Sequence, residues 1–269
     1  METSNLTKER IKKYLDEKEK RFDNRGLLDF RDIEVEEGVS ENAESSVRVK
    51  IGKTEVVVGV KLDIAEPYPD SEDEGTLKTT VELSPLSGKE YEPGPPGIKA
   101  TEIARIVDRS VRETGFIDFK GLCIEEGEKV WQIYLDIYTI NDDGNLIDAS
   151  CLGSIIALKN AQMPVYDKDK GRVDRKKDLT DEKLPLEDKV PVTLTFHKIG
   201  DKFILDPDYT EEETSEARLS IGFVPKDKKV NALQKGKEKP LSVEEVSELI
   251  DSAFENGEVL EEIIKENTE

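Results

Sequence analysis

Four carboxylates lie within six positions of one short segment, and their spacing could support metal-dependent chemistry. They are Asp208, Glu211, Glu212 and Glu213. Magnesium prefers octahedral oxygen ligands, and proteins usually hold it with one or two carboxylates together with a substrate phosphate. A run of charged residues is also typical of a solvated surface loop. The spacing alone leaves both interpretations open.

The residues on either side of this acidic segment predict the elements that would position it. Residues 203–205 form an apolar run that ends at Asp206 and Pro207. Proline lacks a backbone donor and moves the preceding residue out of helical conformation, so this run is expected to be a strand that leaves the core. Residues 217–221 alternate in polarity like a half-buried strand. The carboxylates are therefore predicted to occupy a turn between two strands.

The acidic segment resembles the catalytic segment of RNase PH-like phosphorolytic exoribonucleases. In that family a strand, an acidic turn and a second strand supply two aspartates six residues apart. The matching positions in this chain are Glu212 and Arg218. Glutamate can replace aspartate as a metal ligand, whereas an arginine repels Mg²⁺ and cannot act as a general acid. The resemblance therefore implies that these two are degenerate catalytic positions.

Other motifs extend the resemblance over nearly the whole chain. Residues 21–26 (RFDNRG) and 30–33 (FRDI) are similar to the opening signature of the family, R-x-D-G-R followed by R-P-I, with the glycine and the proline replaced. Residues 90–96 (EYEPGPP) and 102–109 (EIARIVDR) most resemble the non-catalytic RNase PH-like subunit of the archaeal exosome ring.

A second departure from the active family members lies in residues 143–149 (DGNLIDA). Active relatives have a glycine-hydroxyl-arginine turn at a helix start, whose amides, hydroxyl and guanidinium hold inorganic phosphate. The corresponding positions here are Asn145, Leu146 and Ile147. Three nearby aspartates, Asp142, Asp143 and Asp148, further disfavour phosphate. We predict that Asp148 caps the helix, and that the loss of two independent functional positions makes the chain a pseudoenzyme.

The helix predicted at about 98–114 carries a candidate RNA-binding surface. Its apolar residues share one face, and Arg105, Arg109 and Arg112 are predicted to point outward together from the other face. The alternative is salt bridging, because Asp108 with Arg112 and Arg109 with Glu113 are favourable i,i+4 pairs. In the exosome ring, arginines of the corresponding helix face the RNA path, and Arg105 and Arg109 match that pattern more closely than Arg112. The resemblance therefore favours RNA binding.

Composition limits the function classes that the chain can serve. Its 269 residues include 61 acidic and 40 basic side chains, which give a net charge of −21. Neutralisation of phosphates by Lys and Arg supplies most non-specific affinity for nucleic acids, so this charge opposes general nucleic-acid binding. Any contact with RNA must be local.

The cysteines, the single histidine and the hydropathy exclude several kinds of site. Cys123 and Cys151 lie in apolar surroundings without C-x-x-C spacing, so no zinc site or disulfide framework is expected. His197 lies in a strand-like segment without a paired Ser, Cys or second His, so we do not predict catalysis by it. No apolar run approaches the roughly 18 residues of a membrane span, and the first residues lack an apolar signal core. We expect a cytoplasmic protein with no metal, cofactor or membrane contact.

The order of predicted elements indicates an α+β or α/β architecture. The resemblance implies an RNase PH domain, a ribosomal protein S5 domain 2-like fold in which β-sheets pack against helices. We predict an N-terminal helical extension at 1–25 and one domain at 26–269, with halves at about 26–190 and 191–269. The expected elements are a helix at about 7–21, strands at 47–51, 56–62, 81–83 and 131–138, a buried helix at 149–161, a charged connector at 166–189, strands from 190 onward, and a last helix with a capping box at 242–245.

The resemblance also implies a function. It predicts a non-catalytic subunit that alternates with an active RNase PH-like paralogue in a hexameric ring of three heterodimers, bears RNA-binding cap subunits, and binds single-stranded RNA for 3′-to-5′ phosphorolysis. The alternative is a self-sufficient phosphorolytic exoribonuclease whose rearranged acidic site uses Asp206, Asp208 and Glu212.

Overall fold

The computed structural model describes residues 3–175 and 179–268. Within them the chain forms a six-stranded sheet, a four-stranded sheet and a small two-stranded ribbon. The large sheet contains β1 (Ile33–Glu37), β2 (Ser45–Ile51), β3 (Thr54–Ala65), β4 (Thr76–Leu83), β5 (Cys123–Glu125) and β6 (Lys129–Asn141). The small sheet contains β9 (Val192–Ile199), β10 (Lys202–Leu205), β11 (Ala217–Val224) and β12 (Lys229–Gly236), and the ribbon contains β7 (Tyr166–Asp167) and β8 (Arg172–Val173).

The large sheet and the small sheet differ in strand order and in strand direction. The large sheet has the order β1-β2-β3-β6-β4, with β5 paired to the start of β6. Among the strands that the structure describes, only β4 runs parallel to its neighbour β6, with Val81 opposite Ile137. The small sheet is antiparallel, in the order β10-β9-β11-β12.

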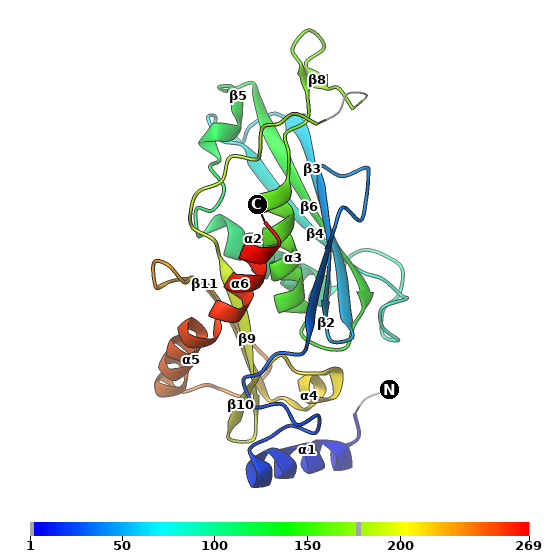
Figure 1. The fold of residues 1–269 in the computed structure, drawn as a ribbon, viewed down its shortest axis with the longest axis vertical. Helices are drawn as coiled ribbons and strands as arrows, with labels where there is room; N and C mark the ends of the chain where they lie inside the picture. Colours follow the sequence, from blue (N-terminus) through cyan, green and yellow to red (C-terminus); the bar gives the residue numbers. More distant parts are fainter. Residues whose placement is uncertain (1–2, 176–178, 269) are drawn as a thin grey trace.

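The helix α3 (Leu146–Asn160) lies between the two sheets (Figure 1). It packs against β2 and β3 of the large sheet and against β9 of the small one. Its residues from Leu146 to Leu158 are all buried, as expected for a helix whose side chains are mostly apolar or small. A Cβ atom at Gly153 would lie 2.8 Å from a methyl group of Val58, so glycine permits this close approach.

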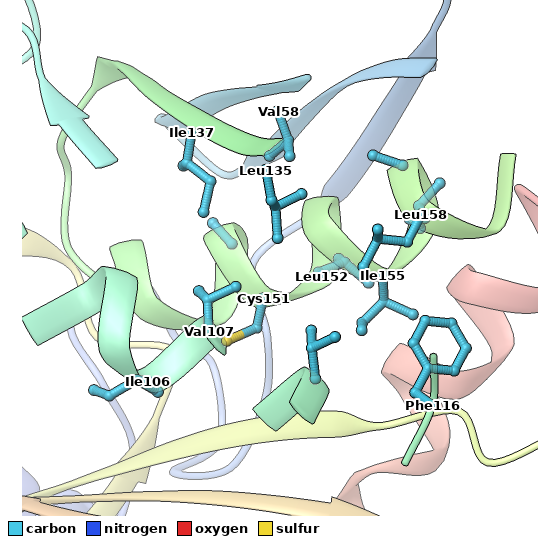
Figure 2. Close-up of a cluster of buried hydrophobic side chains, with 14 of the residues drawn as sticks. Val58, Ile106, Val107, Phe116, Leu135, Ile137, Cys151, Leu152, Ile155 and Leu158 are labelled. Atoms are coloured by element: carbon cyan, nitrogen blue, oxygen red, sulfur yellow. The ribbon is translucent and has the colours of Figure 1, made fainter. Parts of the chain in front are cut away.

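The core on both sides of α3 is aliphatic. Figure 2 shows Leu152 and Ile155 of α3 between Leu135 of the large sheet and Phe116 of the loop that follows α2 (Ile98–Arg112). The apolar face of α2 closes this core, because its residues Ile103, Ile106, Val107 and Val111 are buried.

The remaining helices lie around these layers. The N-terminal helix α1 (Asn5–Lys18) buries Ile11 and Leu15 against β9 and β10 in a separate small cluster. The others are α4 (Tyr209–Thr214), α5 (Val243–Asn256), α6 (Glu258–Glu266) and a 3₁₀ turn at Lys120–Leu122.

The predicted α+β class, with sheets packed against helices, is confirmed. The prediction that the acidic segment forms a turn was wrong, because Asp208 and Glu211 form a capping box that starts the short helix α4 there. The buried helix begins at Leu146 rather than 149, and β4 begins at Thr76 rather than 81. The predicted connector at 166–189 contains β7 and β8, and its residues 176–178 lie outside the described residues.

Candidate functional site

The positions that the family resemblance singled out come together at the start of α3. A small cavity of about 20 Å³ marks this place. It is lined by Lys99, Glu102, Ile103, Asn145, Leu146, Ile147, Thr195, His197, Glu212 and Arg218. A cavity of this volume holds about one water molecule. An inorganic phosphate ion is too large for the space that these side chains leave.

Arg218 is held by two features of its surroundings. Its guanidinium on β11 forms an ion pair with the carboxylate of Glu102 on α2. Gly236 lies opposite Arg218 on β12, where a Cβ atom would come within 2.6 Å of the guanidinium. The packing therefore accommodates a cation at the position where the resemblance expects a metal-binding carboxylate.

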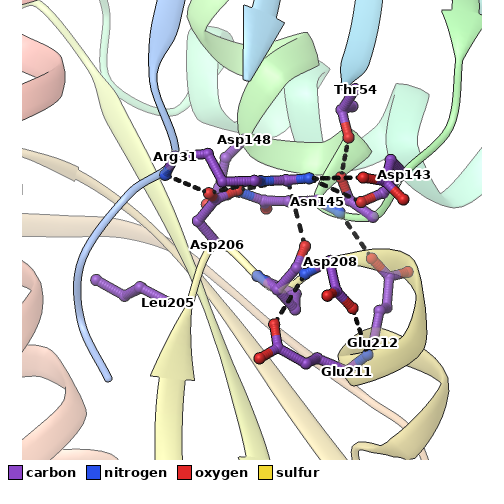
Figure 3. A network of polar contacts seen from close by, with 12 residues as sticks. Arg31, Thr54, Asp143, Asn145, Asp148, Leu205, Asp206, Asp208, Glu211 and Glu212 are labelled. Atoms are coloured by element: carbon purple, nitrogen blue, oxygen red, sulfur yellow. Dashed lines mark hydrogen bonds and ion pairs between the residues drawn. The ribbon is translucent and has the colours of Figure 1, made fainter. Parts of the chain in front are cut away.

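The N-terminus of α3 receives a carboxylate from the chain itself. The N-cap residue Asn145 has φ 61° and donates its backbone N–H to Glu212 over 2.8 Å. Figure 3 shows Glu212 of α4 facing this helix start. Helix N-termini attract anions, so Glu212 occupies part of the site that a phosphate would use.

The prediction that Asp148 caps α3 was wrong. Asn145 takes the N-cap position, and Asp148 lies three residues into the helix, fully buried against β9. Its carboxylate accepts hydrogen bonds from the backbone N–H of Thr195 (3.1 Å) and from the Thr195 hydroxyl (2.7 Å). Burial raises the pKa of Asp148 to about 7.

Sequence reasoning missed Lys99, which supplies a second cation to the cavity. Its Nζ donates to Tyr91 Oη over 2.6 Å and to Asp142 Oδ2 over 2.9 Å. Burial alone would lower the pKa of Lys99, but the charges of Glu212 and Asp142 outweigh it and raise the pKa. The local sequence gives no signal for this role, because Tyr91 and Asp142 come from separate loops.

The arginines of the N-terminal signature hold the acidic segment in place. Arg21 is fully buried, and its Nε donates to Glu211 Oε1 over 3.0 Å. Its other nitrogens donate to the carbonyl oxygens of Leu205 (2.7 Å) and Asp206 (2.6 Å). These contacts fix the path of the chain between β10 and α4.

Asp206 lies at the centre of the polar network that these arginines form (Figure 3). It has φ 44°, and its carboxylate accepts hydrogen bonds from Arg31 (2.7 Å), Arg25 (3.0 Å) and Asn145 (2.9 Å). Burial would raise the pKa of Asp206, but the hydrogen bonds and charge of Arg31 outweigh it and lower the pKa. In the described residues no group of three or more acidic, His or Cys side chains is arranged to hold a metal ion.

The arginines of α2 have separate surroundings. Arg105 and Arg109 are exposed and line a groove of about 430 Å³ between α2 and β12. Neither guanidinium has a hydrogen bond or an ion pair with any residue that the structure describes, so the predicted pair of Arg109 with Glu113 is absent there. We call the surface around these two arginines the α2 groove.

Arg112 is exposed like the other two arginines, but it does not line the α2 groove and has partners within the chain. It forms the expected ion pair with Asp108 at 2.9 Å and donates to the carbonyl oxygen of Leu77 over 3.1 Å. Its guanidinium also lies 5.4 Å from the centre of the Phe119 ring. These contacts direct Arg112 to the edge of the large sheet.

The histidine and the cysteines have buried or partly buried surroundings. His197 is buried in β9 with Nδ1 3.0 Å from Ser215 Oγ, and burial, followed by the charge of Lys237, holds its pKa well below the usual value. Cys123 and Cys151 are both free thiols. Among the described helices, none combines the length and the apolar character that crossing a membrane requires.

Comparison with protein families decides what this fold and site belong to. Residues 29–164 match the model described as 3′ exoribonuclease family, domain 1. Residues 189–256 match the model for domain 2 of that family. The chain belongs to the RNase PH family of 3′ exoribonucleases. The family and the RNase PH fold predicted from the sequence are thus confirmed.

Individual relatives of this RNase PH family member are exosome proteins of archaea. The chain is 45% identical to the exosome complex component Rrp42 of Methanosarcina acetivorans over 241 residues, which cover 89% of this chain and 86% of the relative. It is 40% identical to the Rrp42 component of Pyrococcus furiosus over 248 residues, 91% of this chain and 88% of the relative.

A solved structure supports the same kinship. The Archaeoglobus fulgidus exosome with RNA bound to the active site contains a chain that is 39% identical, with a TM-score of 0.87. The match covers 96% of this chain and 97% of that chain.

Proposed function

We propose that the chain is a non-catalytic subunit of an archaeal exosome ring. In this proposal it alternates with a catalytically intact RNase PH-like paralogue as three heterodimers in a hexameric ring, carries RNA-binding cap subunits, and supports 3′-to-5′ phosphorolysis of single-stranded RNA in the cytoplasm. The similarity to exosome complex components named Rrp42 supports the choice of complex.

One observation carries the non-catalytic assignment. The Glu102–Arg218 ion pair and the Glu212 carboxylate at the start of α3 fill the site that a metal ion and a phosphate would need. The remaining space holds about one water molecule. A cation in place of a carboxylate and an internal anion in place of phosphate both oppose the reaction.

The alternative of a self-sufficient enzyme has less support. It requires free carboxylate oxygens on Asp206 and Asp208. Asp206 accepts hydrogen bonds from two arginines and an asparagine, and Asp208 accepts the Glu211 backbone N–H over 2.8 Å as a helix cap. Both carboxylates already serve the structure.

The role of the α2 groove in this proposal is to bind RNA through Arg105 and Arg109. The two guanidiniums are exposed, lie one helical turn apart and have no partner among residues 3–175 and 179–268, so they are available to phosphates. Arg112 also belonged to the predicted RNA-binding set, but its contacts with Asp108 and Leu77 favour a structural role.

The test is an assay of phosphate-dependent release of nucleoside diphosphates from single-stranded RNA. The purified chain alone should release none, and its mixture with the RNase PH-like paralogue should be active. Release by the chain alone would overturn the proposal if Glu212→Gln abolished it and Glu213→Gln did not. Glu213 is a suitable control because it is the neighbouring carboxylate in α4 and makes no contact with Asn145.

A further inference from the structure

A chain of buried hydroxyl groups connects the interior of the molecule with the α2 groove. Ser220 on β11 lines this groove and is 2% exposed. Its Oγ lies 3.0 Å from Oγ1 of Thr195, the residue opposite it on β9. Thr195 Oγ1 also contacts the buried carboxylate of Asp148, whose Oδ1 lies 2.7 Å away. Two hydroxyl groups thus link a carboxylate at the start of α3 to the α2 groove. We call Asp148, Thr195 and Ser220 the relay.

The two contacts of Thr195 compete for a single proton. A threonine hydroxyl carries one proton, so it donates one hydrogen bond at a time and accepts any other. Thr195 therefore cannot donate to Asp148 and to Ser220 together. In the part of the chain that the structure describes, the Ser220 side chain has no hydrogen-bond partner besides Thr195. The direction of the bond between Thr195 and Ser220 consequently depends on whether Asp148 accepts or donates.

An ionised Asp148 fixes one arrangement of the relay. A carboxylate can only accept hydrogen bonds, so it takes the proton of Thr195. Ser220 must then donate its own proton to Thr195 Oγ1, because two oxygen atoms 3.0 Å apart with no proton between them would both lack a partner. In this state Ser220 presents only lone pairs to the α2 groove.

A protonated Asp148 reverses the direction of both hydrogen bonds. Its Oδ2 accepts the backbone N–H of Thr195 over 3.1 Å, which leaves Oδ1 to carry the proton. Oδ1 then donates to Thr195 Oγ1, and Thr195 donates to Ser220. The hydroxyl proton of Ser220 is released from Thr195 and can point into the α2 groove. The groove gains a hydrogen-bond donor in this state.

The surroundings of Asp148 place both states near neutral pH. The side chain is fully buried, and burial outweighs the hydrogen bonds from Thr195 and raises its pKa to about 7. The charge of Asp206, on the segment between β10 and α4, raises the pKa further. Arg31 is bound to Asp206, so its charge is already compensated there.

The other titratable groups beside the relay keep one charge state. Cys151, one turn further along α3, is buried, and burial raises the pKa of its thiol to about 12. His197 on β9 is also buried, and burial holds its pKa well below the usual value. Both groups are therefore neutral at pH 7. Of these groups, Asp148 is the one that changes charge near neutral pH.

We propose that Asp148 is a positioning residue that acts through Thr195 and decides whether Ser220 offers a donor or an acceptor to a ligand in the α2 groove. The added proton comes from solvent, and no O–H bond of Thr195 or Ser220 breaks, because each hydroxyl group only rotates. The class of ligand rests on the proposed function, in which RNA binds this groove. RNA presents many acceptor oxygens on its phosphates and bases, so it should bind more tightly when Ser220 donates.

Neutron diffraction from crystals of the deuterated full chain tests the relay without any ligand. At about pH 6, one unit below the pKa, a deuteron should lie on Asp148 Oδ1 and the Ser220 deuteron should point into the α2 groove. At about pH 8 the Ser220 deuteron should lie between Ser220 Oγ and Thr195 Oγ1. Identical hydroxyl orientations at the two pH values would overturn the inference and leave the proposed function standing.

A matched pair of valine variants tests the consequence for RNA. Thr195→Val removes the hydroxyl group between Asp148 and Ser220. Thr193→Val removes a hydroxyl group on the same face of β9 that bonds to Ser110 over 3.1 Å and lies outside the relay. Between about pH 8 and about pH 6, assembled rings with the wild-type chain or Thr193→Val should gain about five- to tenfold more affinity for single-stranded RNA than rings with Thr195→Val.

Equal gains for the three proteins would overturn the role of Ser220. Rings that bind no RNA at either pH would contradict the proposed function instead, and the neutron structures would still decide the relay. Asp148→Asn provides a further arm, because the amide Nδ2 donates to Thr195 at every pH. Its RNA affinity should therefore lack the gain seen with the wild type. A gain equal to that of the wild type would rule out Asp148 as the group that titrates.

Discussion

Glu102 on α2 and Arg218 on β11 form an ion pair across the cavity at the start of α3. Both side chains are largely withdrawn from solvent, with exposed fractions of 31% and 12%. Gly236 leaves room for the guanidinium. The pair therefore stabilises the packing of α2 against the small sheet at the place where active relatives are expected to hold a metal ion.

The first prediction concerns this pair. Glu102→Gln should lower the free energy of unfolding by about 1–2 kcal/mol, because it leaves a mostly buried guanidinium without its counter-ion. Urea denaturation measures the change. Glu261→Gln is the control, since it breaks an exposed i,i+4 pair with Lys265 and should cost no more than about 0.5 kcal/mol. Equal effects would mean that the Glu102–Arg218 pair has no special stabilising role.

The second prediction concerns RNA. Arg105→Glu and Arg109→Glu should weaken RNA degradation by the assembled ring without preventing assembly, since both side chains are exposed. Each lost phosphate contact should reduce the salt slope of single-strand binding by about 0.7. Lys13→Glu, an equally large charge change on the exposed face of α1, is the control. A slope equal to that of wild type would remove the RNA-binding role.

The third prediction concerns Arg112, whose substitution distinguishes a role in RNA binding from a role in stabilising the fold. Arg112→Ala should lower the melting temperature, because it removes the contacts with Asp108, Leu77 and Phe119. It should leave the salt slope of RNA binding unchanged. A reduced slope with an unchanged melting temperature would return Arg112 to the RNA-binding set.

The fourth prediction is a pH dependence of stability from Asp148. Its pKa is raised from 3.8 to about 7 in the folded chain, so the folded state holds one more proton than the unfolded state between these values. The free energy of unfolding should therefore fall as pH rises through this window, by at most about 1.4 kcal/mol per pH unit from this group. Asp148→Asn should remove that contribution. An identical pH profile for the variant and the wild type would contradict the raised pKa.

The fifth prediction concerns His197, whose pKa is lowered by burial. A base with a lowered pKa contributes stability above its unfolded-state pKa of about 6.5, and this contribution is lost as pH falls below that value. His197 is the one histidine of the chain, so its imidazole proton resonances can be followed without assignment. They should stay unshifted from pH 8 to pH 6. In Lys13→His the added exposed imidazole should titrate near 6.5, and a similar titration of His197 would contradict its burial.

The sequence by itself determined the features that depend on periodicity and composition. The apolar stripe of α2, the alternation along β6 and the buried position of α3 all follow from side-chain spacing, and the structure has each of them. The quoted motifs were sufficient for the family, which the family models confirm. The boundary at 25/26 and the division near 190 stay predictions.

Only the tertiary structure decided how polar side chains are used. Arg218 and Glu102 are 116 positions apart in the sequence, and Arg21 and Glu211 are 190 positions apart. No local sequence pattern therefore predicts either pair. The same holds for Lys99 with Asp142 and for Asp148 with Thr195. Spacing fixes which face of an element a side chain occupies, whereas its partner depends on which distant segments the fold brings to that face. For this reason the motifs could single out residues that lie at the start of α3, but they could not predict the contacts that these residues make there.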